Sequence, residues 1–252
     1  MTPRSSLVTL CAAVAVVAAI SCGEVPSLTD GIAYITPIQL PMPAVEADSF
    51  LHDSTGAVAP LRVQAFDRSG NEILGVPVTY VVLTLPSKIT IGADGTVKAA
   101  DTVTSVQLVA RIGDRLQTPP ATLPIVPHPT VMARGGADSG FTLPAIKPLP
   151  VTVTGVWNNS AMPVIGVIVR YAITAVYPAT AAGSAVLAND AGGRLRDSTT
   201  AVDTTHAPGG TASRNLVVSA GVDSIVVQAT ALDFNARPLP GSPLRFVLIA
   251  KH

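Results

Sequence analysis

The stretch SVQLVAR (residues 105–111) places Val106, Leu108 and Ala110 on one side of the chain and polar Gln and Arg side chains on the other. This alternation is expected of a β-strand that buries one face and exposes the other to water. Two further stretches with the same alternation are LRVQAF (61–66) and DSIVVQATA (223–231). Turn sequences rich in Asp, Asn and Gly separate such runs. The sequence therefore predicts an all-β protein, with strands about every ten residues.

The composition limits the possible classes of protein. The chain has 252 residues, of which 48% are hydrophobic and 13% are charged, and its formal net charge is zero. Such a chain is too apolar to be disordered and too neutral to bind nucleic acid by neutralising phosphates. We therefore expect one or two folded domains and no nucleic-acid partner.

One strand-like motif occurs three times, as GVPVTYVV from Gly75, GVIVRYAI from Gly166 and GSPLRFVL from Gly241. The first two copies are separated by roughly the 100 residues of an immunoglobulin-type sandwich. We interpret the third copy as the last strand of the second unit, paired in a hairpin with residues 223–231. A truncated third unit is the alternative. The aromatic residues at the shared position, which we expect to pack in a core or an interface, are Tyr80, Tyr171 and Phe246.

The N-terminus has a different character. Arg4 is followed by an apolar run from Leu7 to Ile20 that is interrupted only by Thr9. This run is shorter than the roughly 20 residues of a membrane-spanning helix and is typical of a secretory signal. We predict a helical signal peptide at residues 1–21 and a tether at 22–31, with a buried core helix as the alternative.

The apolar run ends at AISC, which resembles the lipobox of bacterial lipoproteins. The resemblance implies cleavage before Cys22 and a diacylglycerol on its sulfur. Ala19 and Ser21 also satisfy the small-x-small rule of ordinary signal peptidase, which would cut at the same place. The other cysteine, Cys11, would leave with the signal peptide, so Cys22 would have no disulfide partner. By the same resemblance, Gly23 favours the outer membrane or cell surface.

The order of the motifs resembles that of the bacterial immunoglobulin-like (BIG) domains. The first unit shows it in PLRVQAFDRSGNEILGVPVTYVV, ITIGADGTVKAADT and VQLVARIGD. The second is similar to the invasin/intimin branch in VTVTGVWNNSAMPVIGVIVRYAI, TTAVDTTHAPGGTASRNLVV and DSIVVQATAL. The resemblance implies two tandem immunoglobulin-like β-sandwiches, at residues 32–127 and 128–252. The segment at the start of the second unit, residues 128–150, has no counterpart and is a linker, a first strand or both.

Few residues suggest chemistry. The four histidines are scattered, and the sequence has no zinc motif, nucleophile elbow or phosphate loop. DRSGNE resembles the start of a calcium loop, but we favour a hairpin turn in which Asp67 bonds the backbone and Gly70 has a positive φ. Calcium between the two sandwiches remains an alternative. Trp157 is expected either at the surface or against the neighbouring unit. We predict a protein that is not an enzyme and holds no cofactor or metal.

These observations favour a lipid-anchored protein of the cell envelope that acts in adhesion or as a structural module. Its partners would be the membrane, through the lipid on Cys22, and an unidentified protein or surface ligand. The alternative is a secreted or periplasmic ligand-binding accessory module of a larger envelope complex. Contacts are expected from loops at the ends of the sandwiches. The candidate contact residues are Arg68, Asn71, Glu72, Asn189, Asp190, Arg194, Phe234, Asn235 and Arg237.

Overall fold

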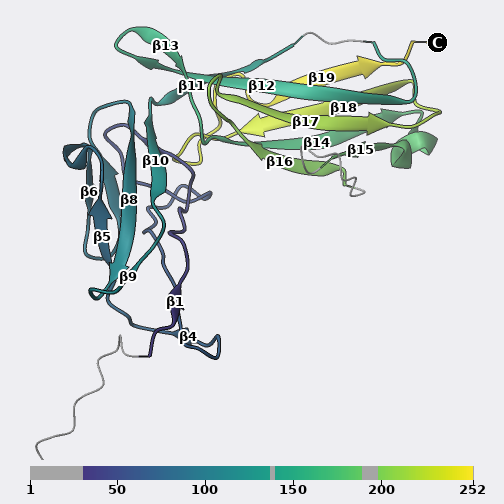
Figure 1. The fold of residues 1–252 in the computed structure, drawn as a ribbon. Coiled ribbons are helices and arrows are strands. Elements are labelled where there is room, and N and C mark those ends of the chain that lie inside the picture. Colours follow the sequence, from purple (N-terminus) through teal and green to yellow (C-terminus); the bar gives the residue numbers. More distant parts are fainter. Residues whose placement is uncertain (1–30, 137–139, 189–197, 252) are drawn as a thin grey trace, which may run out of the picture.

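The computed structural model describes residues 31–136, 140–188 and 198–251. Apart from two short 3-10 turns, its secondary structure is strands, which confirms the predicted all-β, immunoglobulin-like sandwich class. Within the described ranges, each strand pairs only with strands on its own side of Pro127. The two groups of strands, here called unit 1 and unit 2, form a bent molecule with the described C-terminus at the far end of unit 2 (Figure 1). The predicted signal peptide, Cys22 and nearly all of the tether lie outside the described residues.

Unit 1 is built from short strands. Its main sheet has the order β2-β10-β8-β5 with β9 beside β8, and smaller sheets β1-β3-β4 and β6-β7 complete the layers. β2 runs parallel to β10, whereas the other pairs are antiparallel. The elements are β1 (Tyr34–Ile35), β2 (Val45–Glu46), β3 (Ala65–Phe66), β4 (Glu72–Ile73), β5 (Thr79–Val82), the 3-10 turn Pro86–Lys88, β6 (Ile89–Ile91), β7 (Val97–Ala99), β8 (Thr104–Ile112), β9 (Leu116–Gln117) and β10 (Ala121–Val126).

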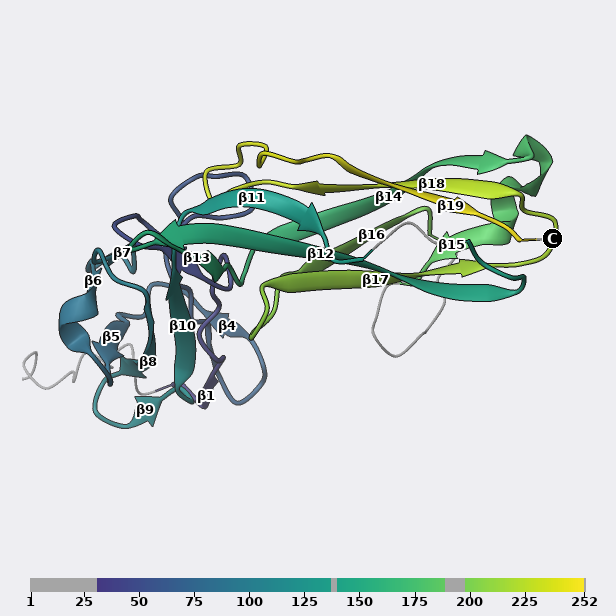
Figure 2. The ribbon, with the colours of Figure 1, turned by 90° about the horizontal axis from the view of Figure 1, so that it is seen from above.

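Unit 2 has longer strands in two facing sheets, with orders β11-β12-β17-β15 and β16-β14-β18-β19. A hairpin partner, β13, extends β12 beyond the sheet, as seen from above in Figure 2. The elements are β11 (Pro129–Arg134), β12 (Ala145–Trp157), β13 (Ser160–Pro163), β14 (Ile168–Tyr177), the 3-10 turn Ala179–Ser184, β15 (Ala185–Leu187), β16 (Thr200–Thr204), β17 (Thr211–Val218), β18 (Ser224–Ala231) and β19 (Leu244–Ile249).

The third copy of the repeated motif is the last strand of unit 2, as expected. β18 and β19 form an antiparallel hairpin, and β14 pairs with the other edge of β18. In unit 1, β8 and β10 pair in the same way, with β5 on the other edge of β8. Copies one and two are therefore β5 and β14, whereas the third copy is β19, the closing strand of unit 2. The alternative of a truncated third unit is wrong.

The segment 128–150 contains a first strand. β11 pairs antiparallel with β12, and Phe141 then makes a parallel bridge to Ala250 beside β19. The Phe141 amide donates to the carbonyl of Ile249, and the Lys251 amide donates to the carbonyl of Phe141. The chain thus contributes first to one sheet and then to the other, which closes the sandwich at this edge.

The core is made mostly of aliphatic side chains from both units, and the buried residues form one continuous cluster. Its members come from alternate strand positions, such as Val106, Leu108 and Ala110 on β8. Of the aromatic residues in the repeated motif, Tyr171 and Phe246 are buried in the core. Tyr80 is half-buried and its hydroxyl donates to the Leu61 carbonyl at 2.9 Å.

Candidate functional site

The first predicted contact loop is the hairpin between β3 and β4. Asp67 accepts hydrogen bonds from the backbone amides of Ser69 (2.7 Å) and Asn71 (2.9 Å), and Gly70 has a φ of 83°. The hydrogen bonds from Asn71, followed by that from Ser69, hold the pKa of Asp67 below its ordinary value of 3.8. The predicted hairpin turn is therefore confirmed. The three candidate residues on this hairpin, all exposed, are Arg68, Asn71 and Glu72.

The second predicted loop follows β18 and repeats the same turn. Asp233 accepts from the amides of Asn235 (2.9 Å) and Arg237 (2.7 Å). Asn235 and Arg237 are exposed, but Phe234 is only 3% exposed. The assignment of Phe234 as a contact residue is wrong, because its ring packs into the apolar core and cannot be presented to a partner. The turn could be predicted from its Asp and Asn residues, but the direction of the Phe234 side chain could not.

The two loops do not form one site. The β3–β4 hairpin lies at the end of unit 1 that points away from unit 2 (Figure 1). The loop after β18 instead faces unit 1: a Cβ added to Gly56 would lie 2.7 Å from the carbonyl carbon and oxygen of Asn235. The third predicted loop, with Asn189, Asp190 and Arg194, lies outside the described residues.

The place where side chains of the two units meet is the junction. Only Pro127 and His128 separate β10 from β11. His128 Nδ1 lies 2.7 Å from Glu46 Oε1, and the Glu46 side chain is only 13% exposed. A Cβ added to Gly166 would lie 2.6 Å from the Cβ of Ala44. A short link, the Glu46–His128 hydrogen bond and the close approach of Gly166 to Ala44 together restrict how the units can move relative to each other.

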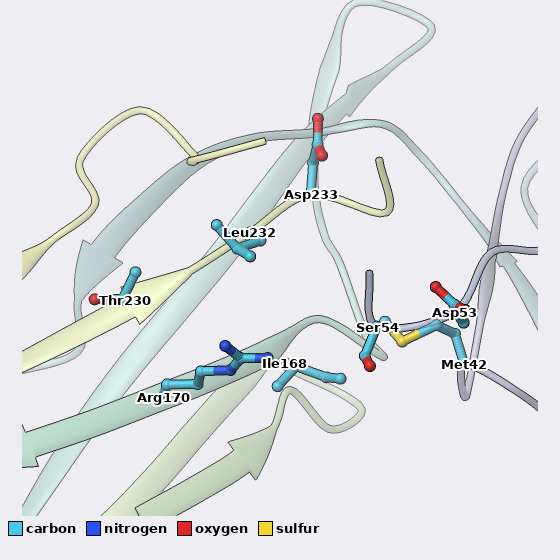
Figure 3. A pocket seen from close by; sticks show the side chains of 8 residues that line it. All are labelled: Met42, Asp53, Ser54, Ile168, Arg170, Thr230, Leu232 and Asp233. Atoms are coloured by element: carbon cyan, nitrogen blue, oxygen red, sulfur yellow. The ribbon is translucent and has the colours of Figure 1, made fainter. Parts of the chain in front are cut away.

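A small cavity of about 50 Å³ lies in this junction. Figure 3 shows residues of unit 1 on one side and residues from β14 and the end of β18 on the other. This volume holds a few water molecules and is far below the roughly 300–1,000 Å³ of a small-molecule site. The lining residues are Met42, Asp53, Ser54, Ile168, Arg170, Thr230, Leu232 and Asp233.

A polar cluster with little solvent exposure joins β16 and β17, one strand from each sheet of unit 2. Arg214 Nη2 lies 3.0 Å from Asp203 Oδ1, with side chains 14% and 10% exposed. Asp203 Oδ2 also accepts from the amide of Ser213 at 2.7 Å. The nearby Tyr171 hydroxyl is buried without a hydrogen-bond partner, and desolvation, then the charge of Asp203, raises its pKa. Arg214 and Asp203 bond to each other and to nearby backbone groups, and Asp203 also lies 3.5 Å from Nε2 of the exposed His206, so we interpret the cluster as structural.

Other features of the described residues give no second site. Among the described residues, no group of three or more His, Cys, Asp or Glu side chains is arranged to hold a metal ion. No helix in that part of the chain is long and apolar enough to cross a membrane. A larger hollow of about 550 Å³ is an open concavity within the β8–β9 hairpin, lined by Arg111 and residues 113–117. Trp157 is half-buried on β12, directly before the exposed Asn158–Asn159 turn.

Sequence reasoning missed the junction. Its close contacts involve Gly56 and Gly166, which in the sequence are indistinguishable from other turn glycines. Gly70 has the same φ as Gly56, yet a Cβ there would meet no atom within 4 Å. Only the three-dimensional structure separates a glycine needed for the turn from a glycine needed for contact between units.

No protein-family model and no curated protein matches the chain. It is similar to solved structures of an S-layer protein and of adhesins. Domains 4 and 5 of the S-layer protein SbsC match over 87% of this chain and 100% of that structure, with 11% identity and a TM-score of 0.33. In the longer rSbsC structure the match spans 28% of that chain.

Two adhesin structures give comparable values. The Yersinia pseudotuberculosis adhesin InvE matches over 87% of this chain and 58% of its own, with 15% identity and a TM-score of 0.34. The Escherichia coli adhesin FdeC matches over 88% of this chain and 66% of its own, with 15% identity and a TM-score of 0.32.

Proposed function

We propose that the protein is a non-enzymatic module of the cell envelope, a rigid two-sandwich arm attached to the membrane through a lipid on Cys22. The observation that supports the rigidity of this arm most directly is the packed junction. A two-residue link, the Glu46–His128 contact and the approach of Gly166 to Ala44 resist bending between the units. Domains joined by a flexible linker and few contacts would move independently. In this arm the two ends would instead keep a fixed distance and orientation relative to each other.

The arrangement of the ends fits such an arm. The described chain begins at Gly31, at the end of unit 1 that is remote from unit 2 (Figure 1). Residues 22–31 would span at most about 35 Å when extended. An anchor at Cys22 would keep this end of unit 1 near the membrane and hold unit 2 away from it, at the outer membrane or cell surface. Several acyl chains would make the attachment stable.

The alternative of a ligand-binding accessory module would require a larger concave site. The junction cavity of about 50 Å³ accommodates waters and not a small-molecule ligand, and the hollow of about 550 Å³ at the β8–β9 hairpin is an open concavity lined mainly by polar residues, unlike an enclosed apolar ligand site. The exposed residues of the β3–β4 hairpin, Arg68 and Glu72 among them, remain the candidates for contact with a protein or surface partner. No observation on the described residues favours the accessory role over the arm.

Two experiments test the proposal separately. For the anchor, cells that express the protein are labelled with radioactive palmitate, and the Cys22→Ser variant should lose both the label and sedimentation with membranes. Retention of the label in Cys22→Ser would rule out the anchor.

For rigidity, nitroxide labels are placed at Arg68→Cys and Ala220→Cys in a chain carrying Cys11→Ser and Cys22→Ser. Both labelled positions are exposed and lie at opposite ends of the molecule. Pulsed electron paramagnetic resonance should give one narrow distance distribution. A broad distribution spanning tens of ångströms would contradict a rigid arm while leaving the anchor untouched.

A further inference from the structure

We propose that an apolar patch at the tether end of unit 1 rests on the surface of the lipid bilayer to which the chain is attached. The patch consists of Tyr34, Phe66 and Leu74 and is here called the tether patch. It lies on the β1-β3-β4 sheet, at the end of unit 1 that is remote from unit 2 (Figure 1). The inference rests on the anchor at Cys22 proposed above and names the partner of this end of the molecule.

The strand register brings the tether patch together. Tyr34 on β1 is opposite Phe66 on β3, which is opposite Glu72 on β4. The rings of Tyr34 and Phe66 stack, with centroids 5.0 Å apart and an interplanar angle of 10°. Leu74 directly follows β4, two residues beyond Glu72. Ala65, next to Phe66 on β3, is buried and points the other way, so the stacked rings lie on the outer face of this sheet.

The side chains of the tether patch are open to solvent and suit a lipid interface. Leu74 is 77% exposed, the highest value among the large apolar side chains of the described residues, and Tyr34 is 49% exposed. Tyrosine is enriched where the hydrocarbon of a membrane meets the headgroups, because its ring is apolar while its hydroxyl stays hydrated. Leucine contributes apolar area that a bilayer removes from water.

The position of the tether patch identifies its partner. The described chain begins at Gly31, where an added Cβ would lie 3.9 Å from Cδ1 of Ile73 on β4. Two residues later, the amide of Ala33 donates to the carbonyl of Phe66 at 2.8 Å. The chain therefore enters unit 1 at the patch itself, and whatever holds the preceding segment also lies near the patch.

The length of the tether limits the distance between the patch and the membrane. Twelve residue steps separate Cys22 from Tyr34, and they span at most about 43 Å when fully extended. Contact between the patch and the bilayer is then effectively intramolecular, so even a small patch is held against lipid. A protein partner or a second copy has no such advantage. The strongly exposed Ile146 and Ile249 belong to strands of unit 2 and lack this restraint.

The polar groups around the patch are compatible with lipid headgroups. Glu72 is exposed on the edge strand β4 and accepts a hydrogen bond from Gln64 Nε2 at 3.1 Å. Two exposed arginines lie on hairpins at this end: Arg68 between β3 and β4, and Arg115 before β9, a strand that lies beside β1. Guanidinium groups form charge-assisted hydrogen bonds with phosphate. Glu72 and the exposed Asp114 balance these two charges, so the contact depends on the apolar side chains more than on the net charge of the lipid.

Hydroxyl-radical footprinting, read by mass spectrometry, tests the proposal because the oxidation rate of a side chain reports its exposure to water. The full chain carrying Cys11→Ser is made by cell-free synthesis and coupled through the Cys22 thiol to a maleimide lipid in phosphatidylcholine vesicles. The same chain before coupling is the reference. This attachment is chemical and does not depend on how cells modify Cys22.

We expect the oxidation rates of Tyr34 and Leu74 to fall at least roughly threefold on attachment, because an interfacial contact places apolar side chains about 5–10 Å into the headgroup boundary. Tyr177, which is 56% exposed at the end of β14 in unit 2, is the internal control and should keep its rate. Unchanged rates at Tyr34 and Leu74 would overturn the proposal, and so would an equal fall at Tyr177.

A pair of variants tests whether the patch itself makes the contact. Leu74→Asp should restore most of the oxidation of Tyr34 in the attached chain, because it places a charge in the contact. The matched control is Ile249→Asp, at a 58% exposed position on β19, which should leave Tyr34 protected. Circular dichroism checks that both variants are folded. Protection of Tyr34 that persists in folded Leu74→Asp would overturn the proposal.

Two further outcomes separate this inference from its alternatives. Protection of Tyr34 that rises with protein concentration in the absence of vesicles would assign the patch to a second copy and overturn the membrane contact. Failure of the palmitate experiment would overturn the anchor but leave a protected Tyr34 in the coupled chain standing. An unprotected Tyr34 would overturn the membrane contact and leave the anchor standing.

Discussion

The two hairpin glycines, Gly56 and Gly70, provide a direct test of the junction. Each is the fourth residue of a turn that begins with an aspartate, and each has a φ of 83°. The amide of Gly56 donates to the Asp53 carbonyl at 3.1 Å, and that of Gly70 donates to the Asp67 carbonyl at 3.2 Å. The local conformations therefore match. The surroundings differ, because a Cβ at Gly70 meets nothing within 4 Å, whereas at Gly56 it would meet the backbone of Asn235 at 2.7 Å.

Alanine at each position separates local strain from contact between the units. Gly70→Ala should cost about 1 kcal/mol, since an L-residue is strained at this positive φ. Gly56→Ala should cost the same amount plus about 1–3 kcal/mol for overpacking against a backbone that cannot rotate away. In a chain of this size, 1 kcal/mol corresponds to about 2–4 °C in Tm. The shift for Gly56→Ala should be two to four times that for Gly70→Ala.

Thermal unfolding followed by circular dichroism measures the two shifts. If unit 2 instead moves away to relieve the clash, the distance distribution between labels at Arg68→Cys and Ala220→Cys should broaden for Gly56→Ala and stay narrow for Gly70→Ala. Equal Tm shifts together with unchanged distance distributions would refute the reasoning, because they would show that the hairpin around Gly56 does not touch unit 2.

Three further predictions concern the polar groups. Tyr171→Phe should raise the free energy of unfolding by about 1 kcal/mol, because it removes a buried hydroxyl that has no hydrogen-bond partner. Tyr80→Phe should lower the free energy of unfolding by a similar amount, because it deletes the hydrogen bond to the Leu61 carbonyl. Urea titration of both variants checks the two signs. Asp203→Ala should destabilise the chain by about 3–5 kcal/mol, because it leaves Arg214 buried without its carboxylate, and a chemical-denaturation loss below about 1 kcal/mol would contradict the buried pair. The pKa of Asp67 lies below its ordinary value of 3.8 in the folded protein. The stabilising effect of the ionised carboxylate should therefore be complete above pH 3.8 and disappear as the pH falls through the folded pKa. The difference in stability between wild type and Asp67→Asn should narrow in that acid range, and a difference independent of pH would argue against the turn hydrogen bonds.

Much of the fold could be predicted because strands have a local signature. The alternation in residues 105–111 and 223–231 became β8 and β18, and the Asp–Gly turn at Asp67 formed as expected. The position of the repeated motif identified the closing strand, β19. Each of these features depends on residues close together in the sequence, so the period of two and the turn chemistry are enough to find them.

Contacts on the surface were harder to predict. Phe234 lies in a polar turn, and its sequence neighbours gave no indication that its ring is buried. Ile146 and Val131 face outward although their residue types favour the core. Whether an apolar residue at a strand position faces the core or the solvent depends on register, and a shift of one residue reverses every side chain.

The sequence by itself determined that the chain forms β-sandwiches of small aliphatic residues, where its hairpins turn, and which strand closes unit 2. The tertiary structure alone decided which glycines bring the two units into contact, that the loop after β18 belongs to the junction, and that Tyr34 and Phe66 stack at the tether end of unit 1. The reason is that strand periodicity and turn preference act over a few bonds. Packing instead joins residues as distant as Gly56 and Asn235, whose proximity exists only after both units have folded and docked.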